Sequence, residues 1–447
     1  MKVVIVGGVA GGASAAARIR RLDDHAQIVM LERSAHVSFS NCALPYYIGG
    51  VVESSDALIM MTPESFKVRH DIDARVNSEV VAILREEKRV RVRETDTGRE
   101  YEESYDKLVL APGANAIRPR GIAGVDNKNV FTVRNVTDVR KLKAYVEEND
   151  VHNIVVAGGG FVGMEIAENF VKAGKSVSLI EGVEQVMAPF DYDMAQILHK
   201  ELLDNGVSLY LGCMVREITE HSVNAVRGGE PIEVPAEAVV LSIGVAPETA
   251  LAVQAGLEIG ESRGIKVNHN YQTNDPDIYA VGDAVETFDR MARKYGVLAL
   301  AGPAQRQARA AADHICGVYH NNNGYIGSSC LRLFAQNAAC TGMNEKAARR
   351  AGVPYDVAYV LPSDKVGIMP DAQYMAFKLV FETPTGRILG AQAIGKGDVV
   401  RRIDVIATML TMGGTLEDLK ELELCYSPVY GTAKDVVNIA ALVGLNL

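Results

Sequence analysis

The segment SFSNCALPYY, residues 38–47, holds one cysteine, with small polar residues before it and an apolar, aromatic run after it. A cysteine thiolate is a nucleophile toward disulfide sulfur, and backbone amides at the start of a helix lower the pKa of a thiol. Because the segment offers no second cysteine, a disulfide of Cys42 must be formed with another molecule, which we expect to be a substrate. The alternative is a buried structural thiol, the more frequent role of a free cysteine.

Two stretches of the chain show an apolar strand, a glycine-rich turn and a helix in that order, a pattern typical of dinucleotide-binding units. In the stretch NIVVAGGGFVGMEIAENFVKAG, which begins at residue 153, Gly158, Gly160 and Gly163 satisfy G-x-G-x-x-G. Such glycines let the turn close, let the backbone approach a pyrophosphate and let the helix pack on its strand. The next strand, SVSLIEG, ends in the acidic residue Glu181.

The other stretch, KVVIVGGVAGGASAAARIRRL from residue 2, departs from the motif at one position. Gly7 and Gly12 match its outer glycines, while Val9 stands in the middle. The strand QIVMLER then supplies Glu32 at the expected distance. A single match is often accidental, but two copies with strand, helix and acid in order are rarely so, and we predict two dinucleotide-binding units.

Two further strands end abruptly in glycine turns, YDKLVLAPGA (105–114) and IYAVGDAVE (278–286). The second places Asp283 just past a strand, where its carboxylate can accept hydrogen bonds from ribityl or ribose hydroxyls. From residue 321 a polar, turn-rich linker leads into the alternating segments MAFKLVFE and GRILGAQAIG and then into two helices. These features predict a third, α+β domain without a dinucleotide motif.

Composition excludes several classes of protein. The formal charge of −10 disfavours nucleic acid as a partner, because phosphate backbones are held by clustered Lys and Arg. The apolar run in MKVVIVGGVAGG is too short for a signal peptide or a membrane span, so we expect a cytoplasmic protein without a membrane partner. Six cysteines without a C-x-x-C pair fit a reducing compartment and predict no metal site.

The order of these motifs resembles the flavoprotein disulfide reductases with two dinucleotide-binding domains, over essentially the whole chain. The stretches GGVAGGASAAARIRRL, SFSNCALPYYIGG and YSPVYGTAKDVVN resemble the single-cysteine branch of that family. This branch contains coenzyme A (CoA)-disulfide reductases and NAD(P)H-dependent CoA-persulfide reductases, together with NADH oxidases and peroxidases. The resemblance implies an α/β fold with two Rossmann-like domains and a C-terminal α+β dimerisation domain. The implied ranges are 1–111 with 245–320 for FAD, 112–244 for NAD(P)H and 321–447 for dimerisation.

The resemblance also implies the cofactors, FAD in the first unit and a nicotinamide nucleotide in the second. The cofactor-binding residues that it implies are Gly7, Gly12, Glu32, Arg33, Ala111, Gly113, Gly282, Asp283, Gly158, Gly160, Gly163 and Glu181. A carboxylate at the end of the second unit's strand, as in Glu181, accepts a ribose 2′-OH and repels a 2′-phosphate. We therefore expect NADH to be preferred over NADPH.

CoA is the substrate class that the resemblance favours, and the mixed disulfide Cys42–S–S–CoA is the expected intermediate. Arg18 and Arg21 lie three residues apart on one helix face, and guanidinium groups bind phosphates such as those of CoA. A solvated helix face is the alternative for these arginines. The substrate residues that the resemblance implies are Ser14, Arg18, Arg21, Ser38, His70 and Lys434.

Acid–base chemistry must come from tyrosine, because the last histidine of the chain, His320, precedes the third domain. The resemblance implies that Tyr426 reaches the active site of a partner subunit in a homodimer, and that Asn41 and Cys42 act beside it. Packing under a loop is the alternative for Tyr426. CoA-disulfide reductases carry a second tyrosine where this chain has Ile368 and Met369. We thus expect CoA disulfide to be a weaker substrate than a persulfide or polysulfide.

Two other functions remain open at this stage. In an NADH oxidase or peroxidase, Cys42 would cycle through sulfenic acid, but the peroxidases of this branch carry a histidine in the first glycine turn and GGVAGG has none. A slow redox-sensing flavoprotein that binds FAD and CoA is the second alternative. No sulfurtransferase domain follows residue 447 in the sequence, so we expect any sulfane-sulfur donor to be a separate molecule.

Overall fold

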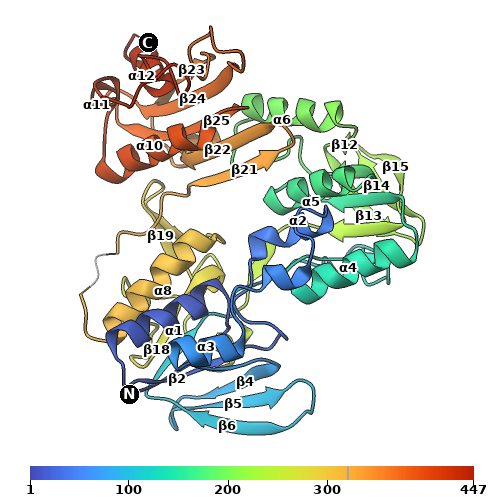
Figure 1. Cartoon of the computed structure of the whole chain (residues 1–447), viewed down its shortest axis with the longest axis vertical. Helices are drawn as coiled ribbons and strands as arrows, with labels where there is room; N and C mark the ends of the chain where they lie inside the picture. Colours follow the sequence, from blue (N-terminus) through green and yellow to red (C-terminus); the bar gives the residue numbers. More distant parts are fainter. Residues whose placement is uncertain (320–321, 447) are drawn as a thin grey trace.

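Two parallel five-stranded sheets carry the two glycine motifs in the computed structural model, which describes residues 1–319 and 322–446 (Figure 1). Each sheet has its glycine-motif strand beside the strand that ends in an acid, because both pairs are parallel and in register. The first sheet, in spatial order, consists of β18 (Ile278–Ala280), β7 (Lys107–Leu110), β1 (Lys2–Val6), β2 (Gln27–Leu31) and β3 (Asp73–Arg75). The second consists of β12 (Ser208–Tyr210), β11 (Ser176–Ile180), β10 (Asn153–Ala157), β16 (Ala238–Leu241) and β9 (Val130–Phe131).

The central strands of both sheets, β1, β7, β10 and β16, are short and largely apolar and are buried on both faces, as expected for parallel sheets covered by helices. The helices associated with these two units are α1 (Ala10–Leu22), α2 (Leu44–Ile48), α3 (Pro63–His70), α4 (Val136–Glu148), α5 (Phe161–Lys172), α6 (Tyr192–Asp204), α7 (Ala250–Gln254) and α8 (Ala301–Ile315). Each unit also carries a three-stranded antiparallel sheet. These are β4 (Ser78–Leu84), β5 (Arg89–Glu94) and β6 (Glu100–Ser104), and β13 (Cys213–Ile218), β14 (Ser222–Arg227) and β15 (Glu230–Pro235).

The chain passes between the two units along a pair of antiparallel strands, β8 (Ala114–Ala116) and β17 (Val245–Pro247). The predicted boundaries at 111/112 and 244/245 fall next to these strands. The predicted boundary at 320/321 lies outside the described residues. Single 3-10 turns, η1 (Asn41–Ala43), η2 (Ser55–Leu58) and η3 (Gly282–Ala284), and a small hairpin, β19 (Thr287–Asp289) with β20 (Lys294–Gly296), complete this part of the chain.

The third domain is an antiparallel five-stranded sheet with helices packed against it, which confirms the predicted α+β character (Figure 1). Its strands in spatial order are β21 (Ser329–Leu333), β22 (Gln336–Gly342), β25 (Ile388–Gly395), β24 (Met375–Glu382) and β23 (Tyr355–Val360). Its helices are α9 (Glu345–Arg350), α10 (Val399–Met412), α11 (Leu416–Lys420) and α12 (Val436–Leu445). Along β24, Phe377 and Leu379 join the core under α10 and α12, whereas Ala376 joins a core shared with the second unit.

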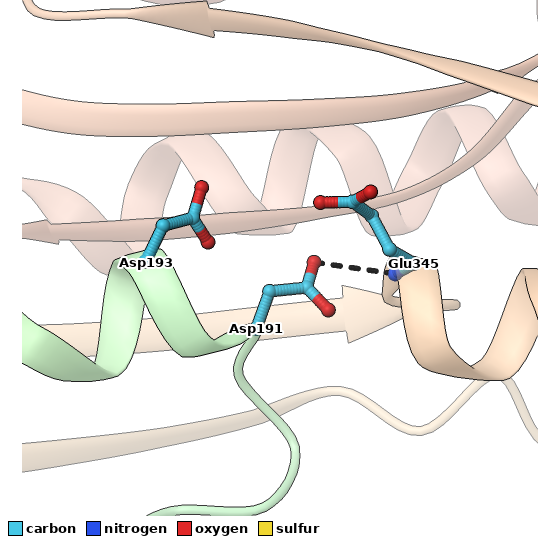
Figure 2. Close-up of side chains that lie close together, drawn as sticks. All are labelled: Asp191, Asp193 and Glu345. Atoms are coloured by element: carbon cyan, nitrogen blue, oxygen red, sulfur yellow. Dashed lines mark hydrogen bonds between the residues drawn. The ribbon is translucent and has the colours of Figure 1, made fainter. Parts of the chain in front are cut away.

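Neighbouring residues of a strand point to opposite faces, so the side chain of Lys378 lies on the face of β24 that is turned toward the second unit. Three carboxylates of that junction, Asp191, Asp193 and Glu345, point toward one another, with oxygens within 4.8 Å (Figure 2). The buried ammonium of Lys378 lies 2.8 Å from Asp193 and 3.4 Å from Asp191, and it also pairs with Glu345. The cluster is thus an ion-paired contact between the second unit and the third domain, with the lysine as its cation.

Within the part of the chain that the structure describes, every helix is too short or too polar to cross a lipid bilayer.

Candidate active site

The first glycine turn is closed by two backbone contacts that leave no room for side chains. Gly7 has φ +95°, and a Cβ there would overlap the carbonyl oxygen of Ala111. A Cβ on Gly12 would overlap the carbonyl oxygen of Gly7, so α1 packs directly on the end of its strand. The buried carboxylate of Glu32 accepts hydrogen bonds of 2.8 Å from the backbone N–H groups of Gly8 and Ser34. Glu32 therefore fixes the turn as well as the end of β2.

The second turn repeats this construction residue by residue. Gly158 has φ +109°, a Cβ there would overlap Ser242, and a Cβ on Gly163 would overlap the carbonyl oxygen of Gly158. Glu181 accepts from the backbone N–H of Gly159 at 2.7 Å and from that of Val183 at 3.1 Å. The duplication seen in the sequence is therefore a duplication of local geometry.

The middle position of the motif is where the two turns differ. A Cβ on Gly160 would meet no atom within 4 Å, so neither fold nor packing requires glycine there. The residue immediately precedes α5, whose first amides are free to face an anion. Val9 takes the same place before α1 and lines a cleft.

That cleft has a volume of about 740 Å³ and opens at the carboxyl ends of β1, β2 and β7, the usual ligand position in a doubly wound sheet. Of the predicted cofactor residues, it is lined by Gly7, Glu32, Arg33, Ala111, Gly113, Gly282 and Asp283, and the predicted catalytic residue Asn41 also lines it. Gly12 packs behind the turn instead. A Cβ on Gly113 would extend into open space, so the cleft leaves backbone accessible to a ligand there. These residues fit a dinucleotide such as FAD.

Asp283 lies on η3 at one end of the cleft. Burial raises the pKa of its carboxyl, and the guanidinium of Arg134, 3.7 Å away, acts in the opposite direction. The backbone N–H of the preceding residue, Gly282, donates a 2.6 Å hydrogen bond to the buried side chain of Gln307 on α8. Arg134 and Gln307 were not predicted from the sequence, because only the tertiary fold brings them to this turn.

Cys42 lies in the 3-10 turn η1, directly after Asn41 and before α2, and its side chain is exposed. Helix amides and a nearby oxidised flavin together are expected to lower the pKa of this thiol, whereas the polypeptide alone shifts the pKa in the opposite direction. Burial raises the pKa of Cys42, and the negative charges of Glu165 and Asp283 raise it further. The short helix α2, five residues long, offers too little dipole to offset these effects.

Asp283 lies close enough to Cys42 for its charge to act on the thiol, and Asp283 and Asn41, the neighbour of Cys42, both line the cleft. Glu165 reaches the thiol from α5, the helix that follows the second glycine motif. Sequence reasoning missed Glu165 and its partner Tyr46, whose hydroxyl lies 3.4 Å from the carboxylate. Both residues lie in stretches recognised in the sequence, but the motifs assign them no role, and only the packing of α2 against α5 brings them together.

The predicted substrate residues of the first unit gather around α1. Ser14, Arg18 and Arg21 follow one face of α1 by spacing, and Arg21 is exposed. Arg18 forms a 2.6 Å ion pair with the buried Asp313 of α8, so part of its charge is already compensated within the fold. Arg20 donates a 2.8 Å hydrogen bond to the carbonyl of His70, which ties the end of α3 to α1.

Ser38, at the other side of the glycine turn, has φ 47° and donates its N–H to the carbonyl of Gly8 at 2.7 Å. It thereby connects the cysteine segment to the first glycine turn.

Tyr426 and Lys434 do not lie in this cleft. Both are exposed on the segment between α11 and α12, at the far end of the molecule from α1 and α2 (Figure 1). Ile368, 84 % exposed, and Met369 lie in a loop of the same domain. A single chain therefore does not bring the predicted catalytic Tyr426 to Cys42.

Comparison with known proteins agrees with the fold. Residues 1–308 match the pyridine nucleotide-disulphide oxidoreductase family, and residues 332–435 match the dimerisation domain of that family. The chain is 30 % identical over 442 residues to a coenzyme A disulfide reductase of Staphylococcus haemolyticus, with 98 % of each chain covered.

Among the solved structures that are similar over the whole chain, two carry names that describe sulfur chemistry. Reduced Bacillus anthracis CoADR-RHD superimposes with a TM-score of 0.97 at 42 % identity, over 100 % of this chain and 80 % of that one. A NAD-dependent persulfide reductase from A. fulgidus superimposes with a TM-score of 0.96 at 34 % identity, over 100 % and 83 %.

Two dinucleotide turns, a cleft for a flavin nucleotide and a C-terminal dimerisation domain define a flavin-dependent oxidoreductase that uses a pyridine nucleotide. The chain belongs to the pyridine nucleotide-disulphide oxidoreductase family.

Proposed function

We propose that the protein is an NADH-dependent, FAD-containing reductase of CoA disulfide, CoA persulfide or polysulfide, with Cys42 as its single redox thiol. The observation that carries this proposal is the position of Cys42, an exposed thiol next to the cleft-lining Asn41 and within the influence of Asp283. The names of the similar proteins, a coenzyme A disulfide reductase and a persulfide reductase, support the substrate class.

The proposed reaction consists of two exchanges at sulfur. The Cys42 thiolate attacks a sulfur of the substrate, forms Cys42–S–S–CoA, and expels CoA thiolate from CoA disulfide or hydrosulfide from CoA persulfide. Two electrons then cleave the mixed disulfide, which restores the Cys42 thiolate and releases CoA. FAD, when bound, supplies these electrons from NADH. Asn41 stands beside the thiol to orient the substrate by hydrogen bonding.

Recognition of CoA is proposed to depend on α1 and its surroundings. Arg21 offers an exposed guanidinium to a phosphate, and Arg18 contributes the charge that Asp313 does not compensate. Ser14 and His70 lie around the same helix, and Ser38 lies on the cysteine segment. Lys434 would come from a second subunit.

We propose that the second unit binds NADH through Gly158, Gly160, Gly163 and Glu181, and that the first binds FAD through the residues predicted for it. The Glu181 carboxylate holds the turn through two backbone N–H groups and places a negative charge where NADPH carries its 2′-phosphate. The charge supports NADH as the preferred nucleotide.

A homodimer completes the site in this proposal. Tyr426 and Lys434 are exposed in a domain that matches the family's dimerisation domain, and they lie far from Cys42 of their own chain. A partner copy can present them to Cys42, where the tyrosine hydroxyl would hydrogen-bond the leaving thiolate.

The domain ranges predicted from the sequence are part of the proposal. A cytoplasmic location is also proposed, and the unpaired cysteines support it.

The test is anaerobic NADH consumption with CoA disulfide, CoA persulfide and polysulfide as separate acceptors, followed by the same assay in air without them. Fast consumption with any of the three sulfur acceptors and slow consumption in air would support the proposal. A preference for the persulfide is expected, because Ile368 and Met369 replace a hydroxyl that assists a CoA leaving group. Consumption in air alone would establish the oxidase alternative, and slow consumption everywhere would establish the redox sensor.

A further inference from the structure

Helix α2, which follows the cysteine, packs closely against α5 of the second unit. At Gly49, the residue that ends α2, a Cβ would overlap the side-chain amide of Asn169, so glycine leaves the space that the Asn169 side chain occupies. Asn169 donates a 2.8 Å hydrogen bond to the carbonyl of Glu165, four residues earlier on α5. On α2, the hydroxyl of Tyr46 lies 3.4 Å from Oε1 of Glu165. The contact between the helices thus fixes a tyrosine and a carboxyl group beside each other.

This pair lies one helical turn from the reactive thiol. Cys42 and Tyr46 are four residues apart in the continuous helical segment formed by η1 and α2, and residues at that spacing share a face. Through its contact with the Tyr46 hydroxyl, Glu165 therefore lies against the face of the segment that carries Cys42. It also lies five residues after Gly160, on the helix whose N-terminus is proposed to bind NADH.

The charged groups around Glu165 and Tyr46 include both acids and bases. On α5, Glu168 is buried and pairs with Lys172. Strand β21 contributes Cys330, whose pKa Glu165 raises, and Arg332, which acts on Tyr46. Asp283, from η3, faces Cys42 and adds a second negative charge there.

These surroundings determine how the pair titrates. Burial raises the pKa of Glu165 to about 7, with Tyr46 lowering it and Glu168 raising it. Burial and the charge of Glu165 raise the pKa of Tyr46 to about 12, so its hydroxyl stays protonated. Since ionised Glu165 also raises the pKa of Cys42, the thiol ionises more readily while Glu165 is protonated, and the titrations of the two groups are coupled.

We propose that Glu165 is a positioning residue that holds the proton released when Cys42 becomes a thiolate, with Tyr46 orienting its carboxyl group. The balance is Cys42–SH plus Glu165–COO⁻ giving Cys42–S⁻ plus Glu165–COOH, so the pair keeps a single negative charge. The proton is then available to the thiolate that leaves the substrate. This inference rests on the proposed role of Cys42 as the redox thiol.

The test measures alkylation of Cys42 by iodoacetamide as a function of pH in the FAD-loaded protein, reduced anaerobically with NADH, with each cysteine peptide quantified by mass spectrometry. In the wild type we expect the Cys42 rate to rise in two steps, with a shoulder near pH 7. Glu165→Gln should give a single step and, at pH 8, alkylation about threefold faster, because a like charge has been removed. Tyr46→Phe should keep two steps and move the first to higher pH, since Tyr46 lowers the pKa of Glu165.

Controls come from the same chain. The Cys316 rate should be unchanged in every variant, because its pKa responds to burial, Asp23, Asp313 and Arg18 and not to Glu165. Glu53→Gln removes one exposed negative charge near α2 and should leave the Cys42 profile as in the wild type. Glu165→Asp keeps a carboxyl group, so its Cys42 alkylation profile should retain two steps. A purely structural role of Glu165 does not require this result.

Two outcomes would overturn the inference. A wild-type Cys42 profile with one step does so without any variant, and a Glu165→Gln profile identical to that of the wild type does so as well. The proposed function fails by a different measurement. If Cys42→Ser still reduces disulfides at the wild-type rate, the proposed function is wrong whatever the alkylation profiles show.

Discussion

The backbone N–H of Gly159 donates a 2.7 Å hydrogen bond to Oε2 of Glu181, as the N–H of Gly8 does to Glu32 in the other unit. Because Glu181 both holds the turn and carries a charge, Glu181→Gln should keep a hydrogen-bond acceptor and lose the repulsion of a 2′-phosphate. We expect the ratio of kcat/KM for NADH to that for NADPH to exceed one in the wild type and to fall about tenfold in the variant. Steady-state kinetics with both nucleotides measures it, and a wild type that prefers NADPH would contradict the expectation.

Two glycines of the second turn should respond differently to alanine. Gly163→Ala places a methyl group on the carbonyl of Gly158, so we expect a loss of about 2 kcal/mol or more in the free energy of unfolding. Gly160→Ala meets no protein atom, so the free energy of unfolding should stay unchanged while the KM for NADH rises about tenfold. Thermal unfolding and kinetics of the two variants separate the effects. Equal destabilisation by both would show that Gly160 serves the fold.

Hybrid dimers test whether Tyr426 acts across the subunit interface. Cys42→Ser and Tyr426→Phe homodimers should each have low disulfide-dependent activity. A hybrid of the two chains contains one site with both Cys42 and Tyr426 intact if the tyrosine comes from the partner, so random mixing should restore about one quarter of wild-type activity. Co-expression with two affinity tags isolates the hybrid, and the purified hybrid, with one intact site of two, should have about one half of wild-type activity. A hybrid no more active than the average of the two parents would place Tyr426 in its own subunit's site or outside any site.

Lys378 should stabilise the junction of the second unit and the third domain. Lys378→Met leaves Asp191, Asp193 and Glu345 without their cation, and we expect a loss of about 3 kcal/mol in the free energy of unfolding. Burial lowers the pKa of Lys378, but hydrogen bonds to Asp193 and Glu345 outweigh burial, so the pKa is raised. The stabilisation by Lys378 is therefore fully present below the ordinary lysine pKa and is lost only as the pH rises through the raised pKa, in strong alkali.

Lys200→Met is a matched control for this prediction, because it removes an exposed i,i+4 pair with Asp204 on α6. It should cost about 0.5 kcal/mol or less. Denaturant unfolding of the two variants gives both values. Equal losses would show that the buried cluster stabilises the protein no more than an exposed ion pair does.

Much of the fold could be predicted because its signals are local. The glycine turns depend on backbone contacts between neighbouring segments, and Gly7 with Gly12 marks the first of them even though Val9 breaks the motif. The third domain was recognisable from its alternation. The two-sided burial of β24, with Lys378 turned to the second unit, was not, because it depends on a surface from another part of the chain.

The candidate site was predicted less completely for the same reason. Tyr46 and Glu165 are 119 positions apart and meet only through the packing of α2 on α5. In the polypeptide alone the pKa of Cys42 is raised, first by burial and then by Glu165 and Asp283, two carboxylates that are distant from the thiol in sequence. Motifs identify the residues that bind common groups, whereas the electrostatics around a nucleophile depend on tertiary neighbours.

The most direct test of the account follows the fate of the Cys42 sulfur. The NADH-reduced, FAD-loaded protein is freed of NADH, mixed anaerobically with one equivalent of CoA disulfide, quenched in acid and digested, and the Cys42 peptide is weighed by mass spectrometry. We expect CoA attached to Cys42 with release of one CoA, removal of that adduct when NADH is added before the quench, and neither adduct nor turnover in Cys42→Ser. Full turnover by Cys42→Ser, or turnover of the wild type without any CoA on Cys42, would contradict the account.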